Sequence, residues 1–311
     1  MVAVLAGGTG GAKLARGMLD AVGPDELVVI ANTADDAEVY GVRVAPDPDL
    51  IAYWLADAID ERGYGIAGDT WEVMGALEAA GRPAWFRLGD RDLAMCLIRT
   101  ELLNAGQRLT DAHAAVVRAM GVGARVLPMS DQPVRTHVRA GDRWRPFQEF
   151  MIVDRAAPAI QEVELRGIGE ARPTPEVLDA IAAADAIVIG PSNPVISIGP
   201  ILALEGMRAA LRDSPAPVVA VSPFVGGAVV KGPTGPFMAH AGLALGNAGI
   251  LSAYGDAIDG LVCDEALPDA ALPVLTMDTL MEDAVGRFNV AEQTRLFAET
   301  LARAPGGKSE R

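Results

Sequence analysis

The sequence predicts an α/β fold: a Rossmann-like, doubly wound, mostly parallel sheet with a helical insertion. Three observations predict it. An apolar run at 1–6 breaks into the glycine-rich segment 7–11 and resumes as a helix. A second apolar strand at 27–31 ends in polar and acidic residues, and the strand-then-glycine pattern recurs at 186–190 and 218–227. A strand, a glycine turn, a helix and a strand with a terminal acid are the opening of a doubly wound nucleotide-binding sheet.

The first glycine turn predicts an anion site. Glycines permit positive φ and close backbone approach, and the N–H groups of a first helical turn point at whatever lies in front of it. We therefore expect Gly8, Thr9, Gly10 and Gly11 to bind a nucleotide phosphate, with Lys13 in the first turn as a cationic contact. Neither a complete dinucleotide fingerprint nor a Walker-type phosphate loop is present. An ordinary strand–helix connection and a solvent-facing lysine are the alternatives.

Composition sets the class of protein. The 311 residues are 50% hydrophobic and 22% charged, which is enough to bury a full core. A net charge of −15 argues against binding to nucleic acid or to an anionic membrane. The two distant cysteines, Cys96 and Cys263, suggest neither a disulfide framework nor a zinc site. The first apolar run is too short for a signal peptide, so we expect a cytoplasmic protein.

Carboxylates follow the second strand. Asp35 and Asp36 stand at its end, and Asp47 and Asp49 lie in a proline-fixed turn, 46–49, ahead of a helical pattern. Either residue of the second pair is a competent helix cap, but both together are more than capping needs.

Residues from about 50 to 125 are expected to form a helical insertion with glycine breaks. Its turn at 68–71 offers Asp69 or Thr70 as a cap. The turn at 87–92 places four charges around a glycine, where the aspartate at 90 is either a cap or, with the two arginines, part of a site for an acidic ligand.

The second half returns to strands. We expect a strand near 124–129, an antiparallel pair of 136–139 with 147–150, an extension at 163–165 and a helix at 175–183. His137 alternates with apolar neighbours and is interpreted as a sheet residue, not a catalyst.

The segment 186–200 is a buried strand followed by a proline-stiffened loop that carries Ser192, Asn193 and Ser197. Ligands of open α/β sheets lie at the carboxyl ends of strands, so these side chains are predicted to bind phosphate oxygens opposite the first glycine turn. A rigid connector is the alternative.

The chemistry has no obvious nucleophile. The sequence lacks a G-x-S-x-G elbow, and its three histidines are scattered. Carboxylates beside phosphate-binding turns favour Mg²⁺-assisted phosphoryl or nucleotidyl-type transfer, in which they hold the metal or accept a proton from an attacking hydroxyl.

Several blocks in one order carry a family resemblance. They are Gly7-Gly8-Thr9-Gly10-Gly11, Asn32-Thr33-x-Asp35-Asp36, Pro46-Asp47-x-Asp49, Leu88-Gly89-Asp90-Arg91-Asp92, Pro128-Met129-Ser130-Asp131, Gly190-Pro191-Ser192-Asn193-Pro194 with Ser197-Ile198-Gly199-Pro200, and Ser222-Pro223 through Gly232-Pro233. From residue 1 to about residue 265 the chain resembles the CofD/FbiA family, the 2-phospho-L-lactate or phosphoenolpyruvate transferases of coenzyme F-420 biosynthesis.

The resemblance implies a reaction and a site. The donor would be a guanosine diphospho-linked three-carbon acid, and the acceptor 7,8-didemethyl-8-hydroxy-5-deazariboflavin (Fo). The terminal ribityl hydroxyl attacks the phosphorus nearest the acid and GMP leaves, with Mg²⁺ required. The resemblance places Asp49 and Arg87 at Fo, Asp49 and Asp47 in catalysis, and the metal on Asp35, Asp36 and Asp47. The glycine turn and the 190–199 loop would hold the guanosine diphosphate, in a homodimer.

One departure and two rival hypotheses accompany the resemblance. Where the family has a polar pair, this chain has Met95-Cys96. The related gluconeogenesis-factor family, whose members sense nucleotide sugars, shares the opening but is expected to lack the blocks at 46–49 and 89–92. A nicotinamide-dependent dehydrogenase rests on the glycine turn alone. The donor's acid, lactyl, enolpyruvyl or glyceryl, is not readable from the sequence. We expect one domain over 1–304 and a disordered tail at 305–311.

Overall fold

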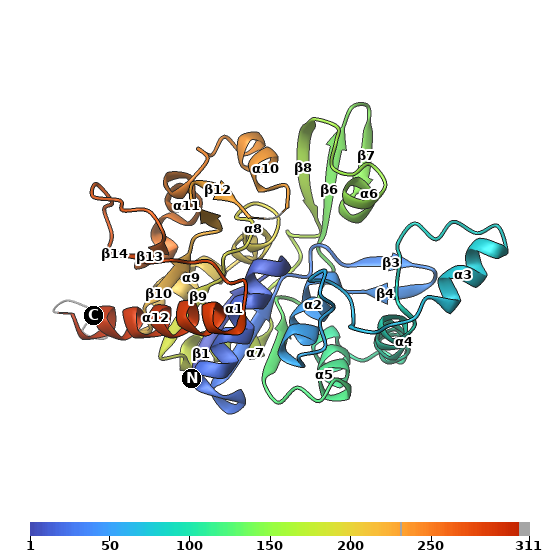
Figure 1. The fold of residues 1–311 in the computed structure, drawn as a ribbon, viewed down its shortest axis with the longest axis horizontal. Coiled ribbons are helices and arrows are strands. Elements are labelled where there is room, and N and C mark those ends of the chain that lie inside the picture. Colours follow the sequence, from blue (N-terminus) through green and yellow to red (C-terminus); the bar gives the residue numbers. More distant parts are fainter. Residues whose placement is uncertain (231, 305–311) are drawn as a thin grey trace.

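Seven parallel strands form the central sheet of the computed structural model, which describes residues 1–230 and 232–304 (Figure 1). The order across the sheet is β14-β13-β10-β9-β1-β2-β5. The strands are β1 (Val2–Ala6), β2 (Leu27–Ala31), β5 (Arg125–Pro128), β9 (Ala186–Ile189), β10 (Val218–Val221), β13 (Gly260–Cys263) and β14 (Val274–Thr276). The chain starts in the middle and extends outward in both directions, which confirms the doubly wound prediction. The tail predicted at 305–311 lies outside the described residues.

The strands are continuous apolar runs because both faces of the sheet are covered. Leu5 pairs with Ile30 on one side and Ile189 on the other, and all three side chains belong to one buried cluster. Val4 and Val29 point to the opposite face and belong to a second cluster. Helices must therefore pack on each face.

Each face has its own set of helices. The face with Val4 is covered by α1 (Gly8–Val22), α2 (Pro46–Leu55) and α12 (Ala284–Arg303). The other is covered by α7 (Pro175–Ala183), α8 (Ile198–Ala203), α9 (Met207–Asp213) and α11 (Asn247–Tyr254). Helices α1 and α12 lie side by side (Figure 1), so close that a Cβ at Gly17 would lie 2.2 Å from the carbonyl oxygen of Arg287. The shorter elements are the 3₁₀ turns η1 (Pro24–Glu26) and η2 (Gly255–Ala257), the hairpin of β11 (Phe224–Val225) with β12 (Ala228–Val229), and α10 (Thr234–His240). Among the described residues, no helix combines the length and apolarity that a membrane crossing requires.

The predicted helical insertion lies between β2 and β5 and extends furthest from the sheet at α3 (Figure 1). It consists of the hairpin β3 (Ala37–Val39) and β4 (Val42–Val44), helix α2, which also packs on the sheet, and then α3 (Glu72–Ala79), α4 (Asp90–Asn104) and α5 (Leu109–Ala119). Tyr40 and Gly41 form the two-residue hairpin turn, both at positive φ, which suits the twist of a tight hairpin. The sequence analysis did not predict this hairpin.

The predicted caps of the insertion are exchanged between two helices. Asp69 accepts a hydrogen bond from the backbone of Arg91 (2.9 Å) at the start of α4. Asp90 accepts one from the backbone of Val73 (3.1 Å) at the start of α3. A Cβ at Gly89 would lie 2.1 Å from Asp69 Oδ2, so this glycine is needed for the exchange. The two carboxylates fix the starts of α3 and α4 against each other.

A separate antiparallel sheet, β7-β6-β8, is formed by β6 (Arg135–Ala140), β7 (Arg143–Pro146) and β8 (Ile160–Arg166). The prediction of a strand at 147–150 is wrong, because these residues begin helix α6 (Phe147–Ile152). Phe147 and Phe150 are three residues apart and share one helix face, where both pack edge-on against Phe237. Their spacing is helical, and the alternation expected of a strand is absent.

Candidate functional site

The carboxyl end of β1 passes almost directly into α1. Only Gly7 separates them, and the glycine segment that we expected to be a turn forms the first turn of the helix from Gly8. A Cβ at Gly10 would lie 2.1 Å from the carbonyl oxygen of Pro191, in the loop after β9. The glycines are therefore explained first by the close approach of that loop, and second by the N–H groups that they leave accessible at the helix start.

The predicted phosphate-binding residues after β9 meet the start of α1. Ser192 Oγ accepts a hydrogen bond from the backbone of Gly7 (3.4 Å), and a Cβ on that glycine would lie 2.8 Å from Ser197 Cβ. Asn193 Oδ1 accepts a hydrogen bond from the backbone of Val195 (2.8 Å), while its Nδ2 is buried without a partner. The structure thus brings together two segments that are distant in the sequence.

Two residues of the predicted anion site differ in position. Thr9 lies in the first turn of α1, as expected. Lys13 lies in the second turn instead of the first, and its Nζ is 5.9 Å from the ring centroid of Trp54 on α2. The expectation of a first-turn lysine is wrong because the helix begins earlier than the glycines suggested.

A carboxylate occupies the start of α1. The residues at 46–49 form the first turn of α2, not a separate turn, with Pro46 at the first helical position. Asp47 Oδ1 accepts the backbone N–H of Gly8 (2.7 Å), and its Oδ2 accepts a hydrogen bond from Asn32 Nδ2 (2.9 Å). Burial nevertheless raises the pKa of Asp47. A phosphate at this helix start meets an acid already there, so the two need a shared cation.

Two further buried carboxylates follow β2. Burial, with the nearby charges of Asp47 and Asp36, raises the pKa of Asp35 well above its usual range. Burial raises the pKa of Asp36 to about 7, although Arg135 and Arg99 favour its charged form. The Oδ1 atoms of both side chains are buried without a hydrogen-bond partner. Buried, unpaired carboxylate oxygens are expensive unless a ligand or an ion satisfies them.

Asp49 faces a buried arginine. Its Oδ1 accepts a hydrogen bond from Arg99 on α4, and the side chains are 4% and 1% exposed. The second carboxylate oxygen, Oδ2, is buried without a partner. Arg99 also donates to the backbone carbonyl of Arg43 (3.0 Å) in β4. Burial raises the pKa of Asp49, and the guanidinium opposes that shift.

The departure from the family at 95–96 lies beside this pair. Asp49, Asp92 and Cys96 form the one group of potential metal ligands, among the described residues, whose ligand atoms all lie within 4.8 Å of one another. Arg99 already neutralises the first, Tyr53 donates to the second (2.7 Å), and burial raises the pKa of the thiol. A guanidinium and a protonated thiol make this group unsuited to a metal ion.

The predicted metal ligands Asp35, Asp36 and Asp47 do not form such a group as they stand. Their chemistry still fits Mg²⁺, which prefers oxygen ligands and commonly takes only one or two carboxylates beside water and phosphate. Asp35 and Asp36 offer buried oxygens without partners, and Asp47 lies at the anion site. We therefore retain these three carboxylates as candidate ligands.

The two predicted Fo-binding residues are not equivalent. Asp49 is enclosed, as described above. Arg87 is 53% exposed, pairs with Glu78 on α3 (3.0 Å) and lies 5.3 Å from the ring centroid of Trp71. It belongs to the outer part of the insertion, and the structure gives it a local partner.

A crevice of about 210 Å³ opens beside the acids that follow β2. Its lining comes from the segment 34–39, the loop with Trp85, strand β6 and the start of α6, and includes Asp35, Asp36, Trp85, Arg135 and Phe147. A lining that combines aromatic rings, two buried acids and an arginine suits a flat, polar-edged ligand. His137 also lines it, in β6 as a sheet residue, as predicted.

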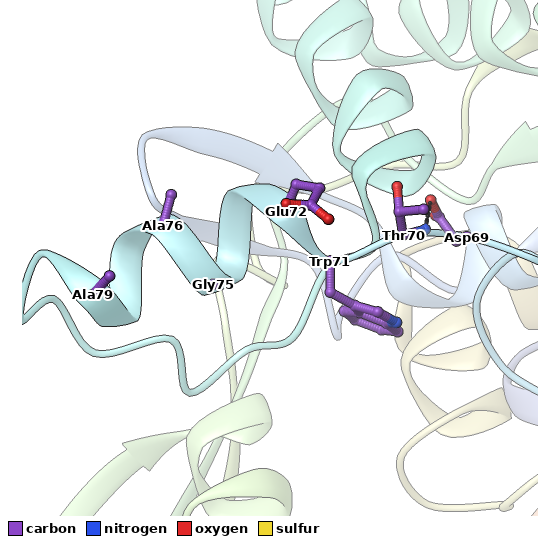
Figure 2. Close-up of a pocket in the computed structure, with 7 residues that line it drawn as sticks. All are labelled: Asp69, Thr70, Trp71, Glu72, Gly75, Ala76 and Ala79. Atoms are coloured by element: carbon purple, nitrogen blue, oxygen red, sulfur yellow. Dashed lines mark hydrogen bonds between the residues drawn. The ribbon is translucent and has the colours of Figure 1, made fainter.

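A second hollow, of about 720 Å³, lies along α3 and is shallow (Figure 2). Figure 2 shows the ring of Trp71 pointing away from the helix, with Asp69, Thr70 and Glu72 at the helix start. Asp69 and Thr70 are engaged in the exchanged caps, since Thr70 Oγ1 donates to Asp90 (2.6 Å). This hollow is larger than the crevice, but its Asp69 and Thr70 side chains are already engaged in the exchanged helix caps.

The sequence analysis did not identify Asn32, Arg99 and Arg135 as site residues. Asn32 belongs to the block Asn32-Thr33-x-Asp35-Asp36, in which only the two aspartates were predicted to be site residues. Arg99 shares one face of α4 with Asp92 and Cys96, since residues three and four apart are neighbours on a helix. That spacing was visible in the sequence and would have found it.

Comparisons with known proteins show the family and the fold. The family model described as 2-phospho-L-lactate transferase CofD matches residues 2–285. A phosphoenolpyruvate transferase of Kitasatospora aureofaciens is 44% identical, over 96% of this chain and 98% of that protein. A 2-phospho-L-lactate transferase of Methanosarcina mazei is 40% identical, over 84% and 86%. A UPF0052-family crystal structure from Bacillus halodurans aligns with a TM-score of 0.60 at 19% identity, over 94% of this chain and 99% of that one, which shows the fold.

Proposed function

The chain belongs to the 2-phospho-L-lactate transferase CofD family, and we propose that it transfers a phospho-three-carbon-acid group to Fo. The donor is the guanosine diphospho-linked acid, the acceptor atom is the terminal ribityl hydroxyl, and the leaving group is GMP. The product belongs to coenzyme F-420 biosynthesis.

One observation carries the proposal: Asp47 joins the anion site to the acids. Its carboxylate accepts a hydrogen bond from the backbone N–H of Gly8, the first residue of α1. Asp35 and Asp36 lie nearby, and each has a carboxylate oxygen without a hydrogen-bond partner. Phosphate-facing backbone and buried carboxylates at one edge of a sheet are what a metal-dependent transfer between phosphate oxygens requires. A protein that only binds nucleotides has no need of three buried acids at this place.

Mg²⁺ would be held by Asp35, Asp36 and Asp47, and when bound it supplies positive charge between the carboxylates and the diphosphate. The chain's own residues do the rest. The start of α1 and the 190–199 loop bind and orient the diphosphate. The crevice beside the acids receives the acceptor.

The transfer step balances with a carboxylate as the base. The ribityl oxygen forms a bond to the phosphorus nearest the acid, and the bond from that phosphorus to the bridging oxygen of GMP breaks. The hydroxyl proton passes to Asp49, whose Oδ2 has no partner within the protein. Asp47 keeps the helix start and the phosphates in register.

Between the donors, we favour the phosphoenolpyruvyl compound. The relative with that name matches 96% of this chain, whereas the 2-phospho-L-lactate transferase of Methanosarcina mazei matches 84%. The two donors differ by only a few atoms, so the test compares both.

The test is mass spectrometry of products after incubation of the purified protein with Fo, Mg²⁺ and each guanylylated acid. We expect a phosphodiester of Fo and an equal amount of GMP, and no product with EDTA. Tight binding of a UDP-sugar without any turnover of Fo would instead favour a regulator of the gluconeogenesis-factor type. A change in NAD(P)H fluorescence on mixing would favour a dehydrogenase.

Two broader properties remain part of the proposal. We propose a homodimer, to be checked by light scattering coupled to size-exclusion chromatography. We also propose a cytoplasmic location, to be checked by fractionation of cells that express the tagged chain.

A further inference from the structure

Arg99 is an unusual residue for the centre of an insertion. Of the residues that the structure describes, it is the only buried arginine, with 1% of its surface exposed. Its guanidinium donates to Asp49 and to the backbone carbonyl of Arg43, while its Nε has no partner. A buried guanidinium with unfilled donors costs stability, so a purely structural role is poorly served by it.

The arginine is placed to act on one carboxylate. It contacts Asp49 Oδ1 and leaves Oδ2 as the oxygen without a partner. Nη2 of the guanidinium donates to Asp49 Oδ1 and Nη1 donates to the carbonyl of Arg43, so a rigid group held at a second point restrains where Oδ1 lies. The same side chain binds β4 through Arg43, which ties the orientation of the acid to the hairpin beside the crevice.

No neighbouring group duplicates this contact. Asp92 is itself acidic and accepts a hydrogen bond from Tyr53. Cys96 lies one turn before the arginine on α4, with its Sγ 4.0 Å from Asp92 Oδ1. The backbone of Ala45 also contacts the Asp49 carboxyl, so Arg99 is the one side chain that donates a hydrogen bond to this acid among the described residues.

We propose that Arg99 is a positioning residue of the transfer reaction, which holds Asp49 so that its free carboxylate oxygen faces the acceptor hydroxyl. The inference rests on the proposed function. Arg99 itself does not touch the reacting atoms and acts only through the carboxylate.

The test is a double-mutant cycle. Four proteins are compared for transfer to Fo: wild type, Asp49→Asn, Arg99→Met and the double variant. Arg99→Lys tests rescue by a cation without the planar fork. Arg16→Met is the matched control, because it removes a two-point arginine–carboxylate pair with Asp57 (2.7 and 2.9 Å) outside the site.

We expect kcat to fall by about 100-fold in Arg99→Met and by about 10-fold in Arg99→Lys, with the KM for the donor unchanged. In the Asp49→Asn background, the same Arg99→Met change is expected to alter kcat by less than about threefold, because its target is gone. The Arg16→Met control should keep the wild-type kcat. Losses that multiply in the double variant, or a folded Arg99→Met protein with wild-type kcat, overturn the proposal.

A second readout separates this inference from the proposed function. Thermal melting of the same four proteins measures the coupling of the two charges without any substrate. We expect the double variant to melt above either single variant, because each single change leaves one buried charge uncompensated. If the wild type transfers nothing to Fo, the proposed function fails and the positioning role fails with it, while the melting cycle still reports whether the pair is coupled. Additive melting shifts contradict the pairing itself.

Discussion

The two halves of the proposed site are built in opposite ways. The phosphate half, where the 190–199 loop meets the start of α1, is made of glycines, small polar side chains and backbone in close contact. The insertion half is made of buried charges, with Asp49 on Arg99 and Asp92 on Tyr53. The first half depends on the absence of side-chain atoms, and the second depends on compensated charge. Substitutions should therefore fail for steric reasons in one half and for electrostatic reasons in the other.

The largest effect is expected for Gly10→Ala. The added Cβ would lie 2.1 Å from the backbone carbonyl oxygen of Pro191, so the loop after β9 must shift. We expect a loss of about 1–3 kcal/mol in the free energy of unfolding. Binding of GDP, measured by calorimetry, should weaken by about 100-fold or more because the loop's phosphate contacts move with it.

Gly75→Ala is the matched control for this change. Gly75 lies within α3 and has open space where its Cβ would be. Removing a helical glycine there should stabilise the protein by about 0.5–1 kcal/mol and leave GDP binding unchanged. Equal behaviour of the two alanine variants would contradict the steric account of the phosphate half.

Next in size is the effect of Mg²⁺ on the acids that connect the halves. If Asp35 helps to hold the ion, saturating Mg²⁺ should raise the melting temperature of the wild type, by an amount equivalent to about 2.7 kcal/mol at 100 times Kd. The Asp35→Asn variant should lose this response, yet melt above the wild type in EDTA, because a buried and unpaired charge has been removed.

Asp179→Asn serves as the control for the metal experiment. Asp179 is exposed on α7, away from the acids, so its variant should respond to Mg²⁺ as the wild type does. An undiminished response of Asp35→Asn would remove that residue from the metal site.

The same contrast explains what the sequence predicted well. Buried strands such as 27–31 and 186–189 were predicted from continuous apolar runs. Such runs are typical of strands in a sheet that is covered on both faces. The helix predicted at 175–183 has these bounds in the structure, because Thr174 caps its start and Pro175 is its first residue. Glycines were visible because a missing side chain is visible in any sequence. The family resemblance then assigned Gly8, Asn193 and Asp49 to one site, although they are far apart in the sequence.

What the sequence missed are relations between residues. Asp69 and Asp90 were recognised as caps, but nothing local shows that each caps the helix that follows the other. Likewise the sequence shows a carboxylate at Asp49, but its pairing with Arg99 depends on how α2 and α4 pack against each other. The strand predicted at 147–150 is wrong because Phe147 and Phe150 are three residues apart, which is helical spacing, and both rings pack against Phe237, a contact that the local sequence does not show.

In the insertion half, the acids should make stability depend on pH. Burial, then the charge of Asp49, raises the pKa of Asp92 to about 6. An acid whose pKa is higher in the folded state favours folding when protonated. Its contribution is therefore complete below its unfolded pKa near 4 and is lost as the pH rises through 6.

Asp92→Asn should flatten this dependence. We expect the wild type to lose roughly 1–3 kcal/mol more than the variant between pH 4 and pH 7, as measured by urea denaturation without Mg²⁺. If the free energy of unfolding changes with pH in the same way in the wild type and the variant, the folded protein does not raise the pKa of Asp92.

The smallest effect is expected at the junction of α3 and α4, where Asp69 accepts a hydrogen bond from the backbone of Asp92 (3.1 Å) and so contacts only the insertion half. Asp69→Ala removes the cap of α4 at Arg91 and should cost about 1 kcal/mol. Amide exchange should quicken in the first turn of α4, while the amides of α1 keep their protection, because the phosphate half is held by contacts of its own.

Asp90→Ala is the reciprocal variant and should quicken exchange at the start of α3 instead. Since Asp92 lies in the uncapped turn of the first variant, transfer should fall in Asp69→Ala more than in Asp90→Ala. Quickened exchange in α1 in either variant would mean that the two halves form one cooperative unit and that the contrast between them is only one of composition.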